Sequence, residues 1–367
     1  MSLDRATPIA VFAACVAALG ASSARAQSLR DEFSVNSAQA TDASPRSGNV
    51  ADALTARFDL SDQWSVAVGG VATLEGKTPA LQRGQFGTSG ALISTLSLGV
   101  DWDPTDHLSL GIAFDLSPSS TQYAGTQLTV SNPGQPNRDA NLLVKSISGE
   151  ENLGLDFGYD TAGDSDAEWA FNTGVQLNNL SSEQDVTAVR FTGSPRTESK
   201  AALVTYCASH PCGRSLKAAL KDTSIALQSI KLSAAGTLTA WVNTDFTLTG
   251  DYYGYNQDPT QLGYFSVAYA GRSVTTGGNG IPLAPLRYLI RPEATHRFGD
   301  LSVRLYLQAG EYVSGAGQGT AGIGTKVQYK FSKKFKLWIS LAGQTDTDDL
   351  GNQTNSGTFA LGAGYRF

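Results

Sequence analysis

The sequence is dominated by short stretches in which apolar and polar residues alternate one by one. In one of them Leu96, Leu98, Val100 and Trp102 fall on one side of an extended chain, and Ser97, Gly99 and Asp101 fall on the other. This period of two is that of a β-strand with one apolar face. The same alternation recurs at 108–115, 153–160, 301–308 and 358–367. It predicts an all-β chain, folded either as a soluble sandwich or as a closed barrel.

The connections between the alternating strands fall into two length classes. The short polar turns are Ser61–Gln63, Pro104–His107, Thr161–Asp166, Asn243–Asp245, Gly299–Asp300 and Ser332–Lys334. The long connections lie at about 76–91, 118–149, 180–223, 257–285, 313–319 and 346–355. A sandwich has long loops at both ends. Short turns that alternate with long loops favour a closed antiparallel transmembrane β-barrel, with short periplasmic turns and long extracellular loops.

Large aromatic residues gather beside the short turns. They are Trp64, Trp102, Trp169, Phe246, Phe298, Phe331 and Phe335, and all of them belong to the apolar faces of their strands. The core aromatics of a soluble domain have no reason to gather at one end of the strands. The pattern predicts an aromatic girdle at one membrane interface.

The last ten residues, Thr358 to Phe367, form a further alternating strand that reads TFALGAGYRF. Gly362, Tyr365 and Phe367 fit the pattern Gly-x-x-aromatic-x-aromatic, and this segment resembles the C-terminal strand of Gram-negative outer-membrane β-barrels of the porin-like kind. In that family the strand closes the barrel and is read by the barrel-assembly machinery. The resemblance implies a place in the cell outer membrane, with lipid and lipopolysaccharide around the wall. It also adds Tyr365 and Phe367 to the predicted girdle.

Residues 1–26 differ from the rest of the chain. Arg5 is followed by the apolar run Pro8 to Gly20 and by Ala24-Arg25-Ala26, a small-x-small cleavage site. These features predict a secretory signal peptide, leaving 27–367 as the barrel. Without residues 1–26 the chain has 25 basic and 32 acidic residues, a net charge of -7. Such an acidic chain is not suited to binding nucleic acid, whose phosphates attract basic surfaces.

The number of strands follows from the turns. The six short turns join twelve strands. If those turns are periplasmic, one strand must precede the first turn and one must follow the last. Arg30 to Gln39 and the terminal stretch supply them, which predicts about fourteen strands. The alternation in Arg30 to Gln39 rests only on Phe33 and Val35, so twelve strands are the alternative.

The polar faces of the strands carry charges of opposite sign in the two halves of the chain. The predicted lumen-lining residues are Asp101, Asp115, Asp156 and Asp160 in the first half, and Arg287, Arg291, Glu293, Arg304, Lys326, Lys330 and Lys336 in the second. In a barrel of this size we expect a narrow lumen with the two groups on opposite walls. Acids facing bases would create a transverse electric field. The alternative is that the charges pair with one another and only brace the wall.

The connection 180–223 is too long for a bare loop. Glu198 to Tyr206 and Ser215 to Lys221 are predicted as short helices. Cys207 and Cys212 lie between them and are expected to form a disulfide in an oxidising compartment. The segment either folds inward as a gate over the lumen or forms a locked surface loop.

The sequence gives little sign of catalysis. Its histidines, His107, His210 and His296, are not accompanied by a Ser-containing catalytic motif. A metal site built from Cys207, His210 and Cys212 would lack a fourth ligand. We therefore expect that the protein is not an enzyme and that it binds neither a cofactor nor a metal.

The expected function is an outer-membrane channel for passive diffusion of small polar solutes through a narrow charged lumen. Two alternatives remain. One is the barrel component of an export or assembly complex, for example for polysaccharide, with periplasmic or homo-oligomeric partners. The other is a surface receptor or adhesive scaffold that acts through its long loops.

Overall fold

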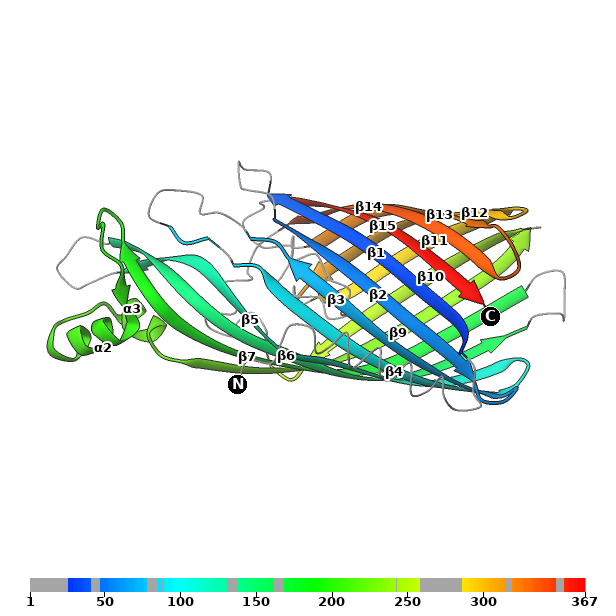
Figure 1. The fold of residues 1–367 in the computed structure, drawn as a ribbon, viewed down its shortest axis with the longest axis horizontal. Coiled ribbons are helices and arrows are strands. Elements are labelled where there is room, and N and C mark those ends of the chain that lie inside the picture. The colour runs from blue at the N-terminus through cyan, green and yellow to red at the C-terminus, as the bar shows by residue number, and fades with distance from the viewer. Residues whose placement is uncertain are drawn as a thin grey trace.

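The computed structural model describes residues 26–40, 47–77, 85–87, 89–130, 138–161, 168–241, 243–257, 286–313, 319–347 and 353–366. Fourteen antiparallel strands close into a barrel, with β8 as one extra strand (Figure 1). The strands of the wall are β1 (Ala26–Ala40), β2 (Ser47–Asp59), β3 (Trp64–Glu75), β4 (Ala91–Thr105), β5 (Leu108–Val130), β6 (Arg138–Asp160), β7 (Glu168–Phe191), β9 (Thr223–Trp241), β10 (Thr244–Tyr255), β11 (Leu286–Phe298), β12 (Leu301–Tyr312), β13 (Gly319–Lys330), β14 (Phe335–Thr347) and β15 (Gln353–Arg366). The two-residue β8 (Glu198–Ser199) pairs with β7.

The predicted count of about fourteen strands is confirmed. The segment with the poorest alternation, Arg30 to Gln39, lies within β1 and pairs with β15 on one side and β2 on the other. Phe33 is opposite Leu361 across the β1–β15 seam. The C-terminal strand therefore closes the barrel against the first strand.

One face of the sheet is polar, and its side chains reach over intervening strands. The Gln308 amide of β12 donates a hydrogen bond of 2.8 Å to Gln344 of β14, across β13. The Trp338 indole of β14 donates one of 2.7 Å to Glu32 of β1, across β15. Only the concave side of a closed sheet brings such side chains together, so this face lines the lumen.

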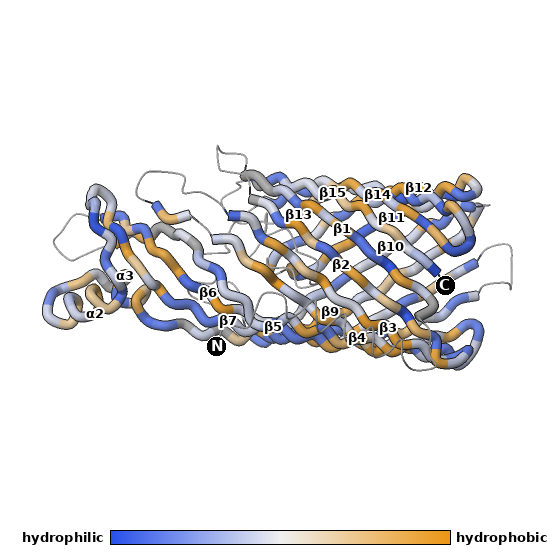
Figure 2. Tube along the Cα trace, viewed as in Figure 1, coloured by the Kyte–Doolittle hydropathy of each residue, from blue (hydrophilic) through white to orange (hydrophobic). Residues whose placement is uncertain are grey.

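The convex face carries the exposed apolar side chains. Leu305 is 56% exposed and Ile323 is 60% exposed, although both lie in the middle of regular strands. Figure 2 shows the resulting alternation as orange and blue segments along the strands. An apolar outer surface around a polar interior is the reverse of a soluble protein and is typical of a barrel surrounded by lipid.

Three strands continue far beyond the rest of the wall. Only the part of β5 up to Leu116 pairs with β4, whereas β5 pairs with β6 as far as Val130 and β6 pairs with β7 as far as Phe191. Most of the predicted loop 118–149, and residues 180–191 of the predicted loop 180–223, are therefore strand. The reason is that this extension has polar residues on much of both faces, so the alternation that identifies a strand in lipid is weak there.

A helical cap sits on the extension, at the end of the molecule opposite the C-terminus (Figure 1). It consists of α2 (Lys200–Ser209) and α3 (Arg214–Ala219), close to the predicted helical ranges. Leu203 and Leu216 pack with Leu142 and Val189 of the extension in a cluster of buried side chains. This cluster accounts for the position of the cap, which lies away from the lumen and not across it as a gate.

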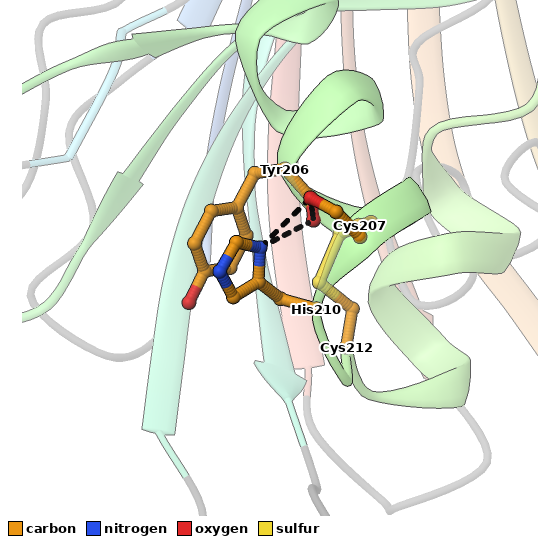
Figure 3. Close-up of a disulfide and its surroundings, with 5 residues drawn as sticks. Tyr206, Cys207, His210 and Cys212 are labelled. Carbon is orange, nitrogen blue, oxygen red and sulfur yellow. Dashed lines mark hydrogen bonds between the residues drawn. A yellow bond between two sulfur atoms is a disulfide. The ribbon is translucent and has the colours of Figure 1, made fainter.

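A disulfide joins the end of α2 to the start of α3. Cys207 and Cys212 have a Cα–Cα distance of 5.4 Å, and the Tyr206 and His210 rings stack at 4.2 Å beside them (Figure 3). At the other end of α2, Lys200 bonds Asp185 and Asp222. Hydrogen bonding to Lys200 lowers the pKa of the Asp222 carboxyl. No helix in the described ranges is long and apolar enough to cross a membrane.

Two glycines let large aromatic rings lie flat on the inner wall. A Cβ atom at Gly362 would lie 2.2 Å from ring atoms of Trp338, and one at Gly324 would lie 2.2 Å from the Tyr306 ring. Trp338 is 2% exposed. The absence of a side chain at Gly362 is what allows the indole to cross β15 and reach β1.

The substitution Gly362→Ala should destabilise the barrel, because the added methyl group occupies the place of the Trp338 ring. We expect a loss of about 1–3 kcal/mol in the free energy of unfolding, as for other overpacked cores, measured by urea titration of the protein refolded in lipid vesicles. Gly343→Ala is the matched control, since nothing lies within 4 Å of a Cβ atom at that position. Equal stability of the two variants would contradict this packing.

Candidate functional site

The charged residues of the lumen lie on two opposite walls. From β5 to β13 the sheet order passes through β4, β3, β2, β1, β15 and β14 in one direction, and through β6, β7, β9, β10, β11 and β12 in the other. Both paths take seven steps, so β5 and β13 face each other across the barrel. The predicted acids come from β4, β5 and β6, and the predicted bases come from β11, β12, β13 and β14.

The acidic wall is centred on Asp101 and Asp156. A Cβ atom at Gly111, between them on β5, would lie 3.2 Å from the Asp101 carboxylate and 3.5 Å from Cβ of Asp156. Arg57 of β2 approaches Asp101 at 3.5 Å, and the Ser65 hydroxyl donates to the same carboxylate at 3.3 Å. Asp101 and Asp156 therefore sit side by side on the inner surface, with Arg57 close to Asp101 and Lys231 of β9 attracted to Asp156.

Asp115 and Asp160 occupy the two ends of this acidic wall. Asp115 is paired in register with Asn152 and Ser97. Asp160 lies beside the short turn that contains His107, whose Nδ1 is 3.5 Å from the carboxylate. The four predicted acids thus form a column that runs along the barrel axis and not a ring at one depth.

The basic wall is organised around Trp338. The charged groups of Arg30, Lys326 and Lys336 lie 5.0, 4.7 and 6.0 Å from the centre of its ring. The ring face carries partial negative charge, so it attracts cations. Its N–H donates to Glu32. The indole therefore holds three cations of β1, β13 and β14 against one patch of the lumen.

A pocket of about 380 Å³ opens in this patch. Its lining consists of Arg30, Thr295, Arg297, Ser302, Arg304, Lys326, Gln328, Lys336 and Trp338. Arg297 and Ser302 flank the Gly299–Asp300 turn, so the pocket lies at the short-turn end of the barrel. No carboxylate is among these nine lining residues.

Carboxylates lie behind several of these cations. Glu32 is 2.9 Å from Arg30 and 3.9 Å from Lys326, and Glu293 is 3.2 Å from Arg304. Asp245 pairs with Arg297. The five basic residues of the pocket thus face three carboxylates, which leaves a net charge of about two. In this pocket some bases are paired with carboxylates, which braces the wall, and a positive charge remains that no carboxylate compensates.

Towards the long-loop end, the same wall continues as a chain of hydrogen bonds. Arg291 donates to Gln308 at 3.1 Å, Gln308 donates to Gln344 at 2.8 Å, and Gln344 donates to Asp346 at 2.8 Å. The Arg291 guanidinium also lies 5.1 Å from the centre of the Tyr306 ring. Arg287 pairs with Glu311 at 3.3 Å. These contacts brace this part of the wall, although Nε of Arg291 is buried and has no hydrogen-bond partner among the described residues.

The structure separates the predicted site residues into these groups and adds others. Lys330 is on the lumen-facing side of β13 but does not line the pocket. Arg30, Glu32, Arg57 and Trp338 were not predicted to take part. Trp338 could have been recognised, because it is the one tryptophan on the polar face of a strand and faces Gly362 in register. The described residues contain no group of three or more His, Cys, Asp or Glu side chains that could bind a metal ion.

The predicted girdle residues lie on the outer surface near the short turns. Trp64 and Trp102 stack at 5.5 Å, and Phe331 packs 5.7 Å from Phe335. Trp169, Phe246, Phe298 and Tyr365 are also exposed. Trp241, which was not predicted, is 67% exposed and packs against Phe246. Phe367 lies outside the described residues.

Solved structures of known proteins show the same fold. No protein-family model and no curated protein matches the sequence. Among solved structures, a Pseudomonas aeruginosa FadL homologue has a TM-score of 0.58 at 10% identity, covering 93% of this chain and 90% of that one. The chain has the fold of an outer-membrane β-barrel. The resemblance predicted from the C-terminal strand is confirmed at that level.

Two further solved structures have similar scores. The Ralstonia pickettii toluene transporter TbuX has a TM-score of 0.56 at 11% identity, covering 93% of this chain and 90% of that one. The CymD monoaromatic hydrocarbon channel has a TM-score of 0.53 at 13% identity, covering 93% of this chain and 89% of that one. At these identities the likeness is one of fold alone.

The substitution Trp338→Phe should weaken the β1–β15 seam. The phenyl ring keeps an aromatic face for the cations but loses the N–H that bonds Glu32, a charge-assisted bond. We expect a loss of about 1.5–3 kcal/mol in the free energy of unfolding, measured by urea titration in vesicles. The control is Trp102→Phe on the outer face. A smaller loss at Trp338 than at Trp102 would contradict the role of this bond.

Proposed function

We propose that this chain is an outer-membrane channel that lets small polar solutes diffuse through its charged lumen. The observation that carries the proposal is the separation of charge across the closed barrel, with Asp101 and Asp156 on one wall and Arg304, Lys326 and Lys336 on the opposite one. Charges of opposite sign on facing walls produce a transverse field, and the low dielectric of the protein concentrates it in the lumen.

Such a field selects solutes by their polarity. Dipolar and charged molecules align with the field, and their contacts with the charged walls replace contacts with water. A hydrocarbon has no charge or large dipole, so the field does not stabilise it in the lumen. The transverse field therefore favours sugars, amino acids and small organic ions as solutes.

The outer surface supports a place in the Gram-negative outer membrane. Exposed leucines, isoleucines and valines cover the middle of the convex face, and aromatic rings gather at the short-turn end, as at a membrane interface. In this setting lipid and lipopolysaccharide surround the wall. The strand from Thr358 to Phe367 is the segment that the barrel-assembly machinery would read, after export directed by residues 1–26.

A second candidate function is a channel for hydrophobic solutes. It is favoured by the similar fold of the toluene transporter TbuX and of the CymD monoaromatic hydrocarbon channel. The charged inner wall of this chain counts against it.

A liposome-swelling experiment distinguishes these two candidates. Vesicles containing the purified protein should swell in solutions of small sugars. The rate of swelling should fall to zero for larger sugars, because the lumen is narrow. Uptake of labelled toluene by the same vesicles should equal that of protein-free vesicles. If no sugar causes swelling and toluene uptake is accelerated, the polar channel is contradicted and the hydrophobic channel is supported.

Removing acidic charge should make the channel more selective for anions. At low salt, a unit charge about 8 Å from a permeating ion changes its energy in water by about 0.5 kcal/mol, or about twofold in permeability ratio. Asp156→Asn should therefore shift the anion-to-cation permeability ratio about twofold toward anions, read from the reversal potential across a planar bilayer. Asp62→Asn, in the exposed turn between β2 and β3, is the control and should give a smaller shift.

A further inference from the structure

The pocket on the basic wall is a distinct recess in the lumen, and its chemistry specifies a class of ligand. We propose that it binds small dianions, that is, solutes carrying two oxyanion charges such as a phosphate or a dicarboxylate. The inference deepens the channel proposal and rests on it for the route by which a solute reaches the pocket.

The lining of the pocket provides donors of the kinds that bind oxyanions. Arg30, Arg297 and Arg304 supply guanidinium groups, and Lys326 and Lys336 supply ammonium groups. Thr295 and Ser302 add hydroxyls, and Gln328 adds an amide. Guanidinium groups match the two oxygens of a carboxylate or phosphate in a forked geometry, and charge-assisted bonds are roughly twice as strong as neutral ones. The same set of groups offers little to an apolar solute.

The charge of the pocket is greater than its carboxylates neutralise. Glu32, Glu293 and Asp245 oppose five bases, so a net charge of about two faces the lumen. Among the described residues no carboxylate lies within 4 Å of the Lys336 ammonium group, whose neighbour is the Trp338 ring at 6.0 Å. Bracing of the wall therefore does not explain Lys336, whereas a bound dianion would neutralise the excess.

The arrangement of these cations is also fixed in advance. Arg30, Lys326 and Lys336 all lie within 6.0 Å of the Trp338 ring centre, so they are held close together in spite of their mutual repulsion. The indole is itself held by Glu32 and by contact with Gly362. Donors that are already in place lose less freedom when a ligand binds, which favours affinity.

The volume sets the size of the ligand. About 380 Å³ is at the lower end of the range of small-molecule sites. It exceeds what a single chloride ion fills and is open towards the lumen. A compact organic dianion or a phosphate group with its hydration shell fits this space.

The test is a direct measurement of binding. The full-length protein, purified in detergent, is titrated in a calorimeter with inorganic phosphate and, separately, with succinate, at constant ionic strength set with chloride. Glucose is the neutral comparison. We expect saturable binding of at least one dianion with a stoichiometry of one, and no binding of glucose. If only phosphate or only succinate binds, the result identifies which oxyanion the pocket accepts. Either result supports the proposal.

Variants locate the binding in the pocket. Lys326→Gln and Lys336→Gln should each weaken it about tenfold, since each removes one charge-assisted bond. Lys330→Gln is the matched control on the same face of β13, outside the pocket, and should change affinity less than about twofold by long-range charge alone. Heat-dependent migration on a gel verifies that each variant forms the barrel. Lys336→Gln is the decisive variant if Lys326→Gln fails to fold.

The outcomes separate this proposal from the channel itself. Absence of saturable binding for both dianions overturns the pocket, as does an equal loss of affinity in the Lys330→Gln variant. If the protein conducts ions but binds neither dianion, the dianion site is contradicted and the channel proposal still stands. Binding without conductance or swelling supports the site and contradicts the channel.

Discussion

The pairing of β1 with β15 is the interaction on which the rest of this structure depends. An open sheet in a membrane would leave a row of backbone N–H and C=O groups facing lipid, where each unsatisfied group costs several kcal/mol. Thirteen residue pairs join the first and last strands, from Ser28 with Arg366 to Ala40 with Thr354. Trp338 strengthens this seam from the inside, because it passes over Gly362 of β15 and bonds Glu32 of β1. Closure of the backbone and organisation of the basic wall are thus linked through one side chain.

Closure also determines where charge can be placed. With apolar residues on most of the convex face, most charges of the spanning strands are directed into a narrow interior, where they must be paired or hydrated. Asp31 and Asp52 are exceptions, since they share the outer face with Phe33 and Val50. The structure does both. Near the long-loop end Arg287 pairs with Glu311 and Arg291 donates to Gln308, whereas near the short turns the bases around Trp338 outnumber their carboxylates. The proposed dianion pocket lies where the bases outnumber the carboxylates.

The sequence predicted the barrel well because the membrane imposes one repeated rule. Alternation, short turns and the terminal strand were sufficient to predict about fourteen strands and the strand Arg30 to Gln39, whose own pattern is poor. The rule no longer applies beyond the lipid, and there the strands within 118–149 and at 180–191 were missed, whereas the two helices and the disulfide within 180–223 were predicted. The pocket was not predicted, although three of its bases were. Its formation depends on Trp338 reaching over a glycine, which is a relation between three strands and not a pattern within one.

The extension of β5, β6 and β7 separates the helical cap from the lumen of the barrel. From Leu116 to Val130 the strand gains 14 residues, a length of about 48 Å at 3.4 Å per residue, more than the roughly 30 Å of a bilayer's hydrocarbon core. The cap at its tip has its own buried cluster and its own disulfide. Substitutions on the exposed surface of the cap therefore leave the packing of the lumen wall in place. The surface of the cap and the proposed route through the barrel can thus vary independently.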